Sequence, residues 1–331
     1  MRKIKVAQIG LNTYSHSCEI FTTMKRLSDV FDIVGYVLPE NERQRLGSKV
    51  SFLDGYKELT LEQVLSYPEL EAVTVETDEA FLTKYALMAA EAGKHVHMEK
   101  PGGAELSDFE ELISVMKKTG KVFHTGYMYR YNPAVSELIR KADNGELGEI
   151  ISVEAQMSCI HTLEARRWLG GFKGGMMFYL GCHLIDLIYR IQGEPKRVIP
   201  FNRSTGVDGV TSEDFGMAVL EYENGVSFAK TSATELGGFQ RRQLVVSGTK
   251  ATVELYPLEQ FDGADVLTGV SEHSSTDWFT PDGKTTVRSG GRYDEMLCSF
   301  AQMVRGEMEN PYNLDYELGM YKVFLRACGN E

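Results

Sequence analysis

The first 125 residues repeat one pattern, in which a short valine-rich apolar run is followed by a stretch of helical periodicity. Short apolar strands that alternate with amphipathic helices are typical of a doubly wound parallel sheet. The predicted strands are Val6–Ile9, Ile33–Leu38, Ala72–Val75, Val96–Met98 and Val122–His124, with helices near residues 16–28, 80–92 and 106–118. Ser107 and Glu110 have the spacing of a capping box and are expected to open the last of these helices.

The pattern changes after Pro133, where strands begin to dominate. Two turn sequences, at 223–225 and 248–250, predict hairpins and therefore a largely antiparallel sheet. The predicted strands are Ile150–Ser158, Arg197–Asn202, Phe215–Tyr222, Val226–Thr234, Arg242–Ser247 and Ala251–Leu255, and the predicted helices are 133–143, 177–192, 293–305 and 315–327. Residues 261–289 are polar and are expected to form loops with short strands. We predict two domains, 1–124 and 125–331, the second being α+β with a large, mostly antiparallel open sheet.

Composition excludes several classes of protein. A net charge of −12 argues against non-specific nucleic-acid binding, which requires a basic face. No apolar stretch approaches the roughly 20 residues of a membrane span, and no signal-peptide core is visible. The five cysteines are scattered and odd in number, so a reduced cytoplasmic chain is the simplest expectation.

The segment His95–Pro101 ends a predicted strand abruptly in an acid, a lysine and a proline. Ligands bind at the carboxyl ends of strands in an open α/β sheet, and Pro101 cannot continue the strand. Lys100 is therefore delivered to the edge where a positive charge can hold a hydroxyl or carbonyl oxygen. A solvated lysine in a turn is the alternative for an isolated residue of this type.

Four segments, in this order along the chain, resemble the Gfo/Idh/MocA family of sugar and polyol oxidoreductases. They are Lys3–Gly10, Glu99–Pro101, Gly126–Pro133 and Gly174–Asp186, the last reading Gly-Gly followed by Gly-x-His-x-x-Asp. The resemblance implies a Rossmann-like N-terminal domain, NAD or NADP as cofactor, and hydride transfer at a sugar, polyol or cyclitol carbon. It also implies a small-molecule substrate. Because helices can cover only one face of the large antiparallel sheet, we expect the other face to form the interface of a homodimer or homotetramer.

The implied cofactor site departs from the family pattern. Its predicted residues are Gly10, Leu11, Asn12, Thr13, Leu38, Thr77, Glu99 and Lys100. Only the first glycine of Gly-x-Gly-x-x-Gly remains, although Asn12 tolerates positive φ better than most residues. Leu38 stands where NAD-preferring members carry an acid for the ribose hydroxyls. Arg43 and Arg45 could reach a 2′-phosphate, so the choice between NAD and NADP stays open.

The resemblance implies that Lys100 and His183 are catalytic, while Tyr179 replaces the usual aspartate. A histidine of ordinary pKa, near 6.5, suits transfer of the hydroxyl proton, and Lys100 would stabilise the developing charge on oxygen. A phenol is neutral at pH 7, so the site loses a negative charge beside His183. Asp186, one turn later, could supply part of that charge, although the resemblance implies a structural role for it. Tyr127, Trp168, Lys100, Tyr179 and His183 are the predicted substrate-binding residues.

Other readings remain open from the sequence. His95 and His97 share a strand face without a recognisable third ligand, so no metal site is predicted. The leading function is an NAD(P)-dependent oxidoreductase acting on CH–OH groups. The alternatives are a redox-neutral NAD-dependent lyase or glycosidase, and a non-catalytic nucleotide or sugar sensor with the same fold.

Overall fold

The computed structural model describes residues 2–263, 265–278 and 284–330, which divide into two compact units. The first unit comprises Met1–Tyr127 and Tyr293–Leu318, and the second comprises Met128–Arg292 and Gly319–Glu331. This division differs from the predicted 1–124 and 125–331 because a C-terminal segment returns to the first unit. Its contacts with the first unit include the following two. Phe300 packs against the rings of His97 and His124, at centroid distances of 5.7 and 5.3 Å, and the Asn310 side chain donates to the Phe123 carbonyl over 2.8 Å.

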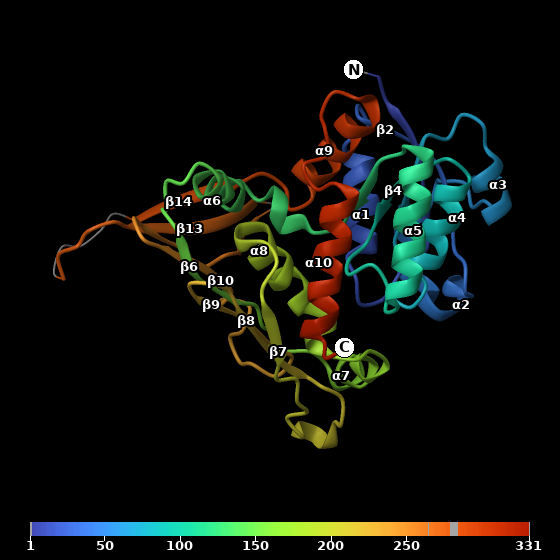
Figure 1. Cartoon of the computed structure of the whole chain (residues 1–331). Coiled ribbons are helices and arrows are strands. Elements are labelled where there is room, and N and C mark those ends of the chain that lie inside the picture. The colour runs from blue at the N-terminus through green and yellow to red at the C-terminus, as the bar shows by residue number, and fades with distance from the viewer. Residues whose placement is uncertain (1, 264, 279–283, 331) are drawn as a thin grey trace. The chain divides into compact units, whose positions relative to one another are not determined.

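The first unit contains the predicted parallel sheet, which is confirmed (Figure 1). Its five strands run in the order β2-β1-β3-β4-β5. The strands are β1 (Ile4–Ile9), β2 (Phe31–Val37), β3 (Ala72–Val75), β4 (His95–Met98) and β5 (Phe123–Thr125). Because the order reverses at β1, the crevice between the ends of β1 and β3 is the place where such folds bind ligands.

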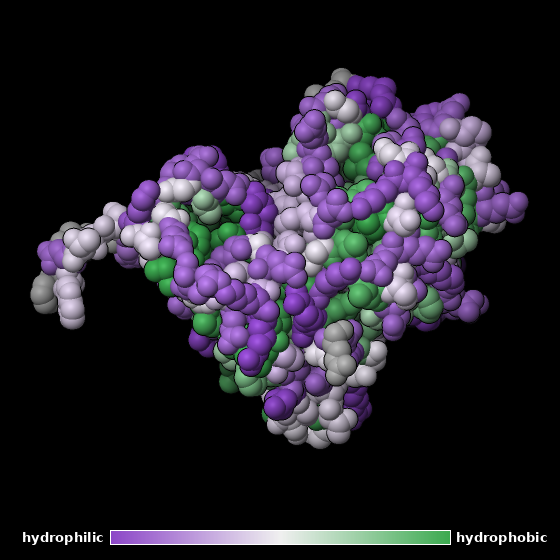
Figure 2. Space-filling view, viewed as in Figure 1, coloured by the Kyte–Doolittle hydropathy of each residue, from purple (hydrophilic) through white to green (hydrophobic). Residues whose placement is uncertain are grey.

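Helices connect these strands, and their packing follows from apolar stripes. They are α1 (Ser17–Arg26), α2 (Glu42–Leu46), α3 (Leu61–Ser66), α4 (Leu82–Glu91), α5 (Leu106–Thr119) and α9 (Asp294–Arg305), with the start of α10 (Leu314–Ala327). In α5 the buried side chains Phe109, Leu112, Ile113 and Met116 recur at helical spacing. On the face shown in Figure 2, hydrophilic side chains dominate over α4 and α5, and hydrophobic ones show between the helices.

The predicted capping box of α5 is wrong. The helix begins at Leu106, so Ser107 lies inside the first turn, and the N-cap residue Glu105 makes no side-chain cap. The capping box occurs instead at α3, where Thr60 and Gln63 exchange hydrogen bonds of 3.1 and 2.9 Å.

The second unit contains the predicted large sheet, which is mostly antiparallel, with β6 and β9 as a parallel pair. The order is β12-β13-β11-β10-β6-β9-β8-β7, and β14 pairs with β13. The strands are β6 (Ile150–Gln156), β7 (Arg197–Pro200), β8 (Phe215–Glu221), β9 (Val226–Ser232), β10 (Gln243–Gly248), β11 (Thr252–Leu255), β12 (Gln260–Asp262), β13 (Asp265–His273) and β14 (Lys284–Ser289). Residues 261–289 therefore form longer strands than expected, and only part of the predicted loop lies in the described residues.

The helices of the second unit are α6 (Pro133–Asp143), α7 (Leu163–Trp168), α8 (Cys182–Gln192) and the end of α10. The predicted helix 177–192 begins as a five-residue π-helix, Met177–Gly181, which continues into α8. In the described part of the chain, no helix is long and apolar enough to cross a membrane, and no two cysteines form a disulfide.

Candidate functional site

The ends of β1 and β3 approach each other closely at Gly10 and Thr77. Gly10 has φ +87°, and a Cβ placed on it would lie 2.5 Å from the Thr77 Cβ. Any larger residue at position 10 would therefore push the two strand ends apart. The close approach of Thr77 therefore requires a glycine at this first position of the predicted cofactor loop. A glycine is also the residue that lets a pyrophosphate approach the backbone closely in such folds.

The loop after Gly10 holds its shape through side chains in place of the missing glycines. The Asn12 carboxamide accepts the Tyr14 amide over 3.0 Å and donates to Glu79 over 2.6 Å. The Ser17 hydroxyl accepts the Asn12 amide over 3.1 Å and donates to the Asn12 carbonyl, also over 3.1 Å. Thr13 stands exposed at the loop tip. Side-chain hydrogen bonds therefore hold this turn, which leads into α1.

Glu42 is a buried acid of this crevice that sequence reasoning missed. Its carboxylate accepts the Leu11 amide over 2.9 Å and the Thr77 hydroxyl over 2.7 Å. Burial raises the Glu42 pKa to about 7, against the lowering effect of these two donors. One loop amide is therefore already satisfied by a side chain.

Leu38 directly follows β2 and is half-buried. Of the two arginines considered for a 2′-phosphate, Arg43 bonds Tyr36 over 2.8 Å and pairs with Glu58 over 2.7 Å. Arg45 lies 3.9 Å from Glu42. Both guanidinium groups therefore have acidic or phenolic partners within the first unit.

Lys100 follows β4 and is buried, with 3 % of its surface exposed. Its Nζ atom lies 3.6 Å from Oε1 of Glu99. Two further buried acids, Glu76 and Glu79, follow β3. Burial raises the Glu79 pKa to about 8, whereas the charge of Lys100 lowers it. Burial, and then the neighbouring charge of Glu99, raise the pKa of Glu76 well above its usual range. Three buried acids, Glu76, Glu79 and Glu99, and the buried Lys100 thus lie at the carboxyl edge of the sheet.

The two histidines of β4, His95 and His97, contact different groups. The Nδ1 atoms of His97 and His124 lie 2.7 Å apart, and His97 Nε2 lies 3.6 Å from Glu76. Burial lowers the His97 pKa to about 3. The His95 ring accepts the Val122 amide over 3.0 Å. No group of three or more potential metal ligands occurs in the described residues.

In the second unit, the glycine pair before the π-helix is required by close packing. Gly175 has φ +47°, and a Cβ on it would lie 2.2 Å from the Glu213 carbonyl oxygen. This entry leads to Tyr179, whose ring meets Trp168 edge-on at 5.4 Å and His161 at 5.5 Å. The structure therefore places two predicted residues, Tyr179 and Trp168, in one aromatic group. π-Helices are frequent at functional sites.

His183 lies in the first turn of α8 and is 4 % exposed. Its ring meets the ring of Tyr129 edge-on at 5.2 Å. Asp186, one turn later, accepts two hydrogen bonds of 3.0 Å from Arg130 Nε and one of 2.6 Å from Arg130 Nη2. Asp186 is thus bound to an arginine of the Gly126–Pro133 segment, as its predicted structural role requires.

Tyr129 connects His183 to a buried ion cluster that the sequence did not reveal. Its hydroxyl donates to Glu259 and accepts from Arg242 over 2.9 Å. Arg242 also donates to Glu259 over 3.0 Å, as does Arg292. Burial raises the Tyr129 pKa to about 12, so the hydroxyl keeps its proton.

Tyr127, a predicted substrate residue, lies in the first unit and is fully buried. A tyrosine two positions later, Tyr129, contacts His183 within the second unit. Nothing in the spacing of the segment distinguishes these two tyrosines. The sequence could have indicated Glu76 and Glu79 as site residues, since both follow the third predicted strand. The pairing of Tyr129 with Glu259 could not be predicted in this way, because the two residues are far apart in sequence.

Two family models match the chain. An oxidoreductase family with an NAD-binding Rossmann fold matches residues 4–127, and the GFO/IDH/MocA C-terminal domain matches residues 135–254. The chain belongs to the Gfo/Idh/MocA family of oxidoreductases. The NAD-binding match covers most of the first unit, and the turn at Gly10 joins β1 to the N-terminus of α1, which is where such folds bind a pyrophosphate.

The similar proteins include a diol dehydrogenase and an inositol dehydrogenase. The chain is 26% identical over 254 residues to trans-1,2-dihydrobenzene-1,2-diol dehydrogenase from Bos taurus, which covers 71% of the chain and 70% of that protein. It is 24% identical over 200 residues to an NADP-dependent scyllo-inositol 2-dehydrogenase from Bacillus subtilis, over 60% of the chain and 55% of that protein. The aldose-aldose oxidoreductase of Caulobacter crescentus, solved with glycerol, shares the fold, with a TM-score of 0.79 at 20% identity over 99% and 98% of the two chains.

Proposed function

We propose that this oxidoreductase uses NAD or NADP to convert a hydroxyl-bearing carbon of a sugar, polyol or cyclitol to a carbonyl, or the reverse. The observation that carries the proposal is the buried Lys100 at the carboxyl end of β4, in the family's Glu-Lys-Pro segment. A buried ammonium is strongly desolvated, so it interacts with a developing oxyanion far more strongly than a surface lysine does.

The roles of the side chains follow from their chemistry. The nicotinamide cofactor, when bound, supplies the hydride acceptor or donor. Lys100 holds the reacting oxygen and stabilises its developing negative charge. His183 takes the hydroxyl proton in the oxidation direction. Tyr179, a neutral phenol in the aromatic group with Trp168, positions the substrate by a hydrogen bond.

Lysine and histidine variants test these roles separately. Lys100→Met should lower turnover about 10²- to 10³-fold, because one oxyanion donor is lost. Nucleotide binding should remain, measured as the rise in melting temperature on adding NAD or NADP. His183→Ala should remove the acidic limb of the oxidation pH profile, since a protonated imidazole cannot accept the proton. Lys117→Met, at a surface position, is the control for loss of a lysine.

These measurements also separate the alternatives. Steady-state release of NADH or NADPH indicates a dehydrogenase, whereas product formation without net cofactor reduction indicates a lyase or glycosidase. Near-native turnover of His183→Ala on an identified substrate would contradict the proton-transfer role. Nucleotide binding without turnover on any tested sugar or polyol would favour the sensor.

We also propose that the chain forms a homodimer or homotetramer through one face of its large sheet. Burial alternates along β8, so one set of its side chains is fully covered and the other is half-exposed. Val226 on β9, which pairs with Glu221 of the half-exposed set, is 52 % exposed. Light scattering that shows a monomer at micromolar concentration would contradict this proposal.

A further inference from the structure

Buried acids surround the edge of the first sheet where such folds bind a pyrophosphate. In the part of the chain that the structure describes, four carboxyl groups and one ammonium group are buried there, those of Glu42, Glu76, Glu79, Glu99 and Lys100. The proposed catalytic roles use only Lys100 among them. Because a pyrophosphate is negatively charged, these acids would repel it if they were ionised.

Two of the acids are bonded directly to the turn between β1 and α1. Glu42 accepts the Leu11 amide over 2.9 Å, and Glu79 accepts a hydrogen bond from the Asn12 carboxamide over 2.6 Å. The same carboxamide accepts the Tyr14 amide over 3.0 Å, so one side chain connects Glu79 to the backbone of the turn. A pyrophosphate approaches this turn at the N-terminus of α1. A charge on Glu79 therefore acts on that ligand at short range.

Among the described residues, no cation is hydrogen-bonded to Glu79. The side chain is fully buried, and its Oε1 atom has no hydrogen-bond partner there. The groups that face it come from the turn and from the ends of β3 and β4, and they are Asn12, Glu76, Asp78, Glu99 and Lys100. Three of these groups are acids. Burial raises the pKa of Glu79 to about 8, against the lowering effect of the Lys100 charge, so the carboxyl group keeps its proton at neutral pH.

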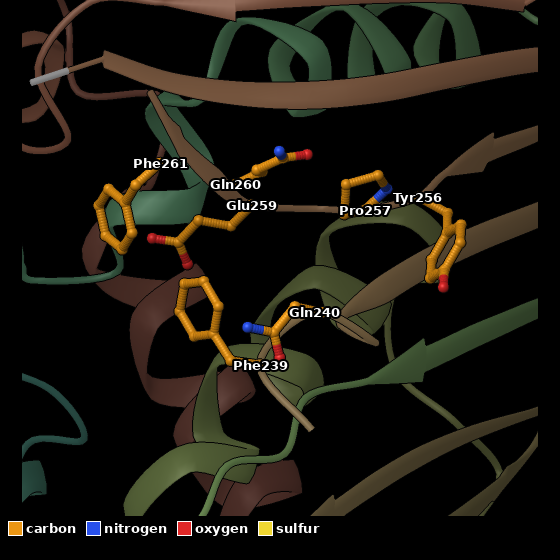
Figure 3. Close-up of a pocket in the computed structure, with 7 residues that line it drawn as sticks. All are labelled: Phe239, Gln240, Tyr256, Pro257, Glu259, Gln260 and Phe261. Atoms are coloured by element: carbon orange, nitrogen blue, oxygen red, sulfur yellow. The ribbon is translucent and has the colours of Figure 1, made fainter. Parts of the chain in front are cut away.

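Burial alone does not hold a proton on a carboxyl group. Glu259 of the second unit, shown in Figure 3, is also buried, with 1 % of its surface exposed. It accepts from Arg242 and Arg292 over 3.0 Å each, and their charges stabilise its ionised form. Glu79 differs because its bonded partner is a neutral carboxamide. Its charge is therefore removed by protonation and not by pairing.

We propose that Glu79 couples dinucleotide binding to a proton. The nucleotide binds while Glu79 is neutral, and binding to the ionised protein takes one proton from the solvent. Glu79 acts through its charge and through Asn12, so it is a positioning residue and not a contact of the ligand. The inference rests on the nucleotide binding of the proposed function and not on its substrate. Affinity should be constant while Glu79 is protonated and should fall as the pH rises above about 8.

The test measures the dissociation constant of NAD on the full-length protein by calorimetry at pH 7 and pH 9. NAD is the probe because its pyrophosphate does not titrate in this range, and it lacks the 2′-phosphate of NADP, which titrates nearby. We expect the native protein to bind NAD tenfold or more weakly at pH 9 than at pH 7. Titrations at pH 9 in two buffers of different ionisation enthalpy should show about one proton taken up per NAD bound.

Glu79→Gln keeps an acceptor for Asn12 and cannot ionise. It should bind NAD at pH 7 as the native protein does, and it should lose about tenfold less affinity than the native protein between pH 7 and pH 9. The comparison removes any contribution of Glu42, which both proteins contain. Glu62→Gln, at an exposed position in α3, should retain the native pH dependence. A purely structural role of Glu79 would change the affinity of Glu79→Gln by the same factor at both pH values.

Equal affinity of the native protein at the two pH values, or a pH dependence that Glu79→Gln retains, overturns the inference. Binding at pH 9 without proton uptake overturns it as well, and that measurement needs no variant. Absence of NAD binding at pH 7 has the same consequence. Turnover of a sugar or polyol with pH-independent NAD binding overturns only this inference. Proton-linked NAD binding without turnover of any sugar or polyol overturns only the proposed function.

Discussion

Glu259 in the second unit and Glu76 in the first are both shielded from water, but their surroundings differ. Glu259 accepts from a phenol and two guanidinium groups. Neither oxygen of Glu76 has a hydrogen-bond partner among the described residues, and the acid Glu99 stands near it. A buried charge is stable when it is paired and bonded, whereas an unpaired carboxyl group takes up a proton instead. The first unit thus buries protonatable acids, and the second buries a fixed charge.

The largest effect is expected from neutralising the fixed charge. Glu259→Gln leaves two arginines without their shared counter-ion and should lower the free energy of unfolding by about 3–5 kcal/mol. Glu76→Gln replaces a protonated acid by a neutral amide and should not lower it. Denaturant unfolding measures both, with Glu254→Gln on β11 as the control. Equal losses of unfolding free energy for Glu259→Gln and Glu76→Gln would contradict the difference between a paired charge at Glu259 and a protonated acid at Glu76.

A smaller effect is expected in the pH dependence of stability. The folded-state pKa of Glu79 is raised by burial to about 8, above its ordinary value of 4.5. Between these values the unfolded chain has lost the proton and the folded chain keeps it. The free energy of unfolding should therefore fall as pH rises from about 4.5 to about 8, by at most ~1.4 kcal/mol per pH unit from this group.

Glu79→Gln should flatten this slope, measured by denaturant unfolding across that pH range. Glu62→Gln, at an exposed position in α3, is the matched control. A slope that is the same in the Glu79 variant and in the native protein would show that Glu79 is ionised in the folded state.

The smallest effect is expected from adding an acid at a position that is not fully buried. Leu38 is half-buried at the end of β2, so Leu38→Asp keeps its carboxylate partly hydrated. The native protein should discriminate between NAD and NADP by less than about tenfold, or ~1.4 kcal/mol. The variant should shift toward NAD because the acid can bond the ribose hydroxyls and repels a 2′-phosphate. Strong selectivity of the native protein for NAD over NADP that the substitution leaves unaltered would contradict the placement of Leu38 at the ribose-binding position after β2.

The sequence predicted the strands of the first unit well because each is a short apolar run between helices, and that pattern is local. Thr77 and Leu38 likewise lie at strand ends, which strand prediction alone locates. The Tyr129–Glu259–Arg242 cluster was not predictable, since its members come from separate segments whose approach depends on the whole sheet. The π-helix at Met177–Gly181 also escaped prediction, because its side-chain spacing reads as an ordinary helix.

The segment Tyr293–Leu318, which belongs to the first unit, has a consequence for how the protein is made. Domains usually fold as they leave the ribosome, N-terminal first. Here the ring that packs on His97 and His124 comes from Phe300, which is synthesised after the entire second unit's sheet. The nucleotide-binding unit therefore cannot complete its core during synthesis until the chain is nearly finished. Expression of residues 1–127 alone would yield a domain that lacks part of its own interior.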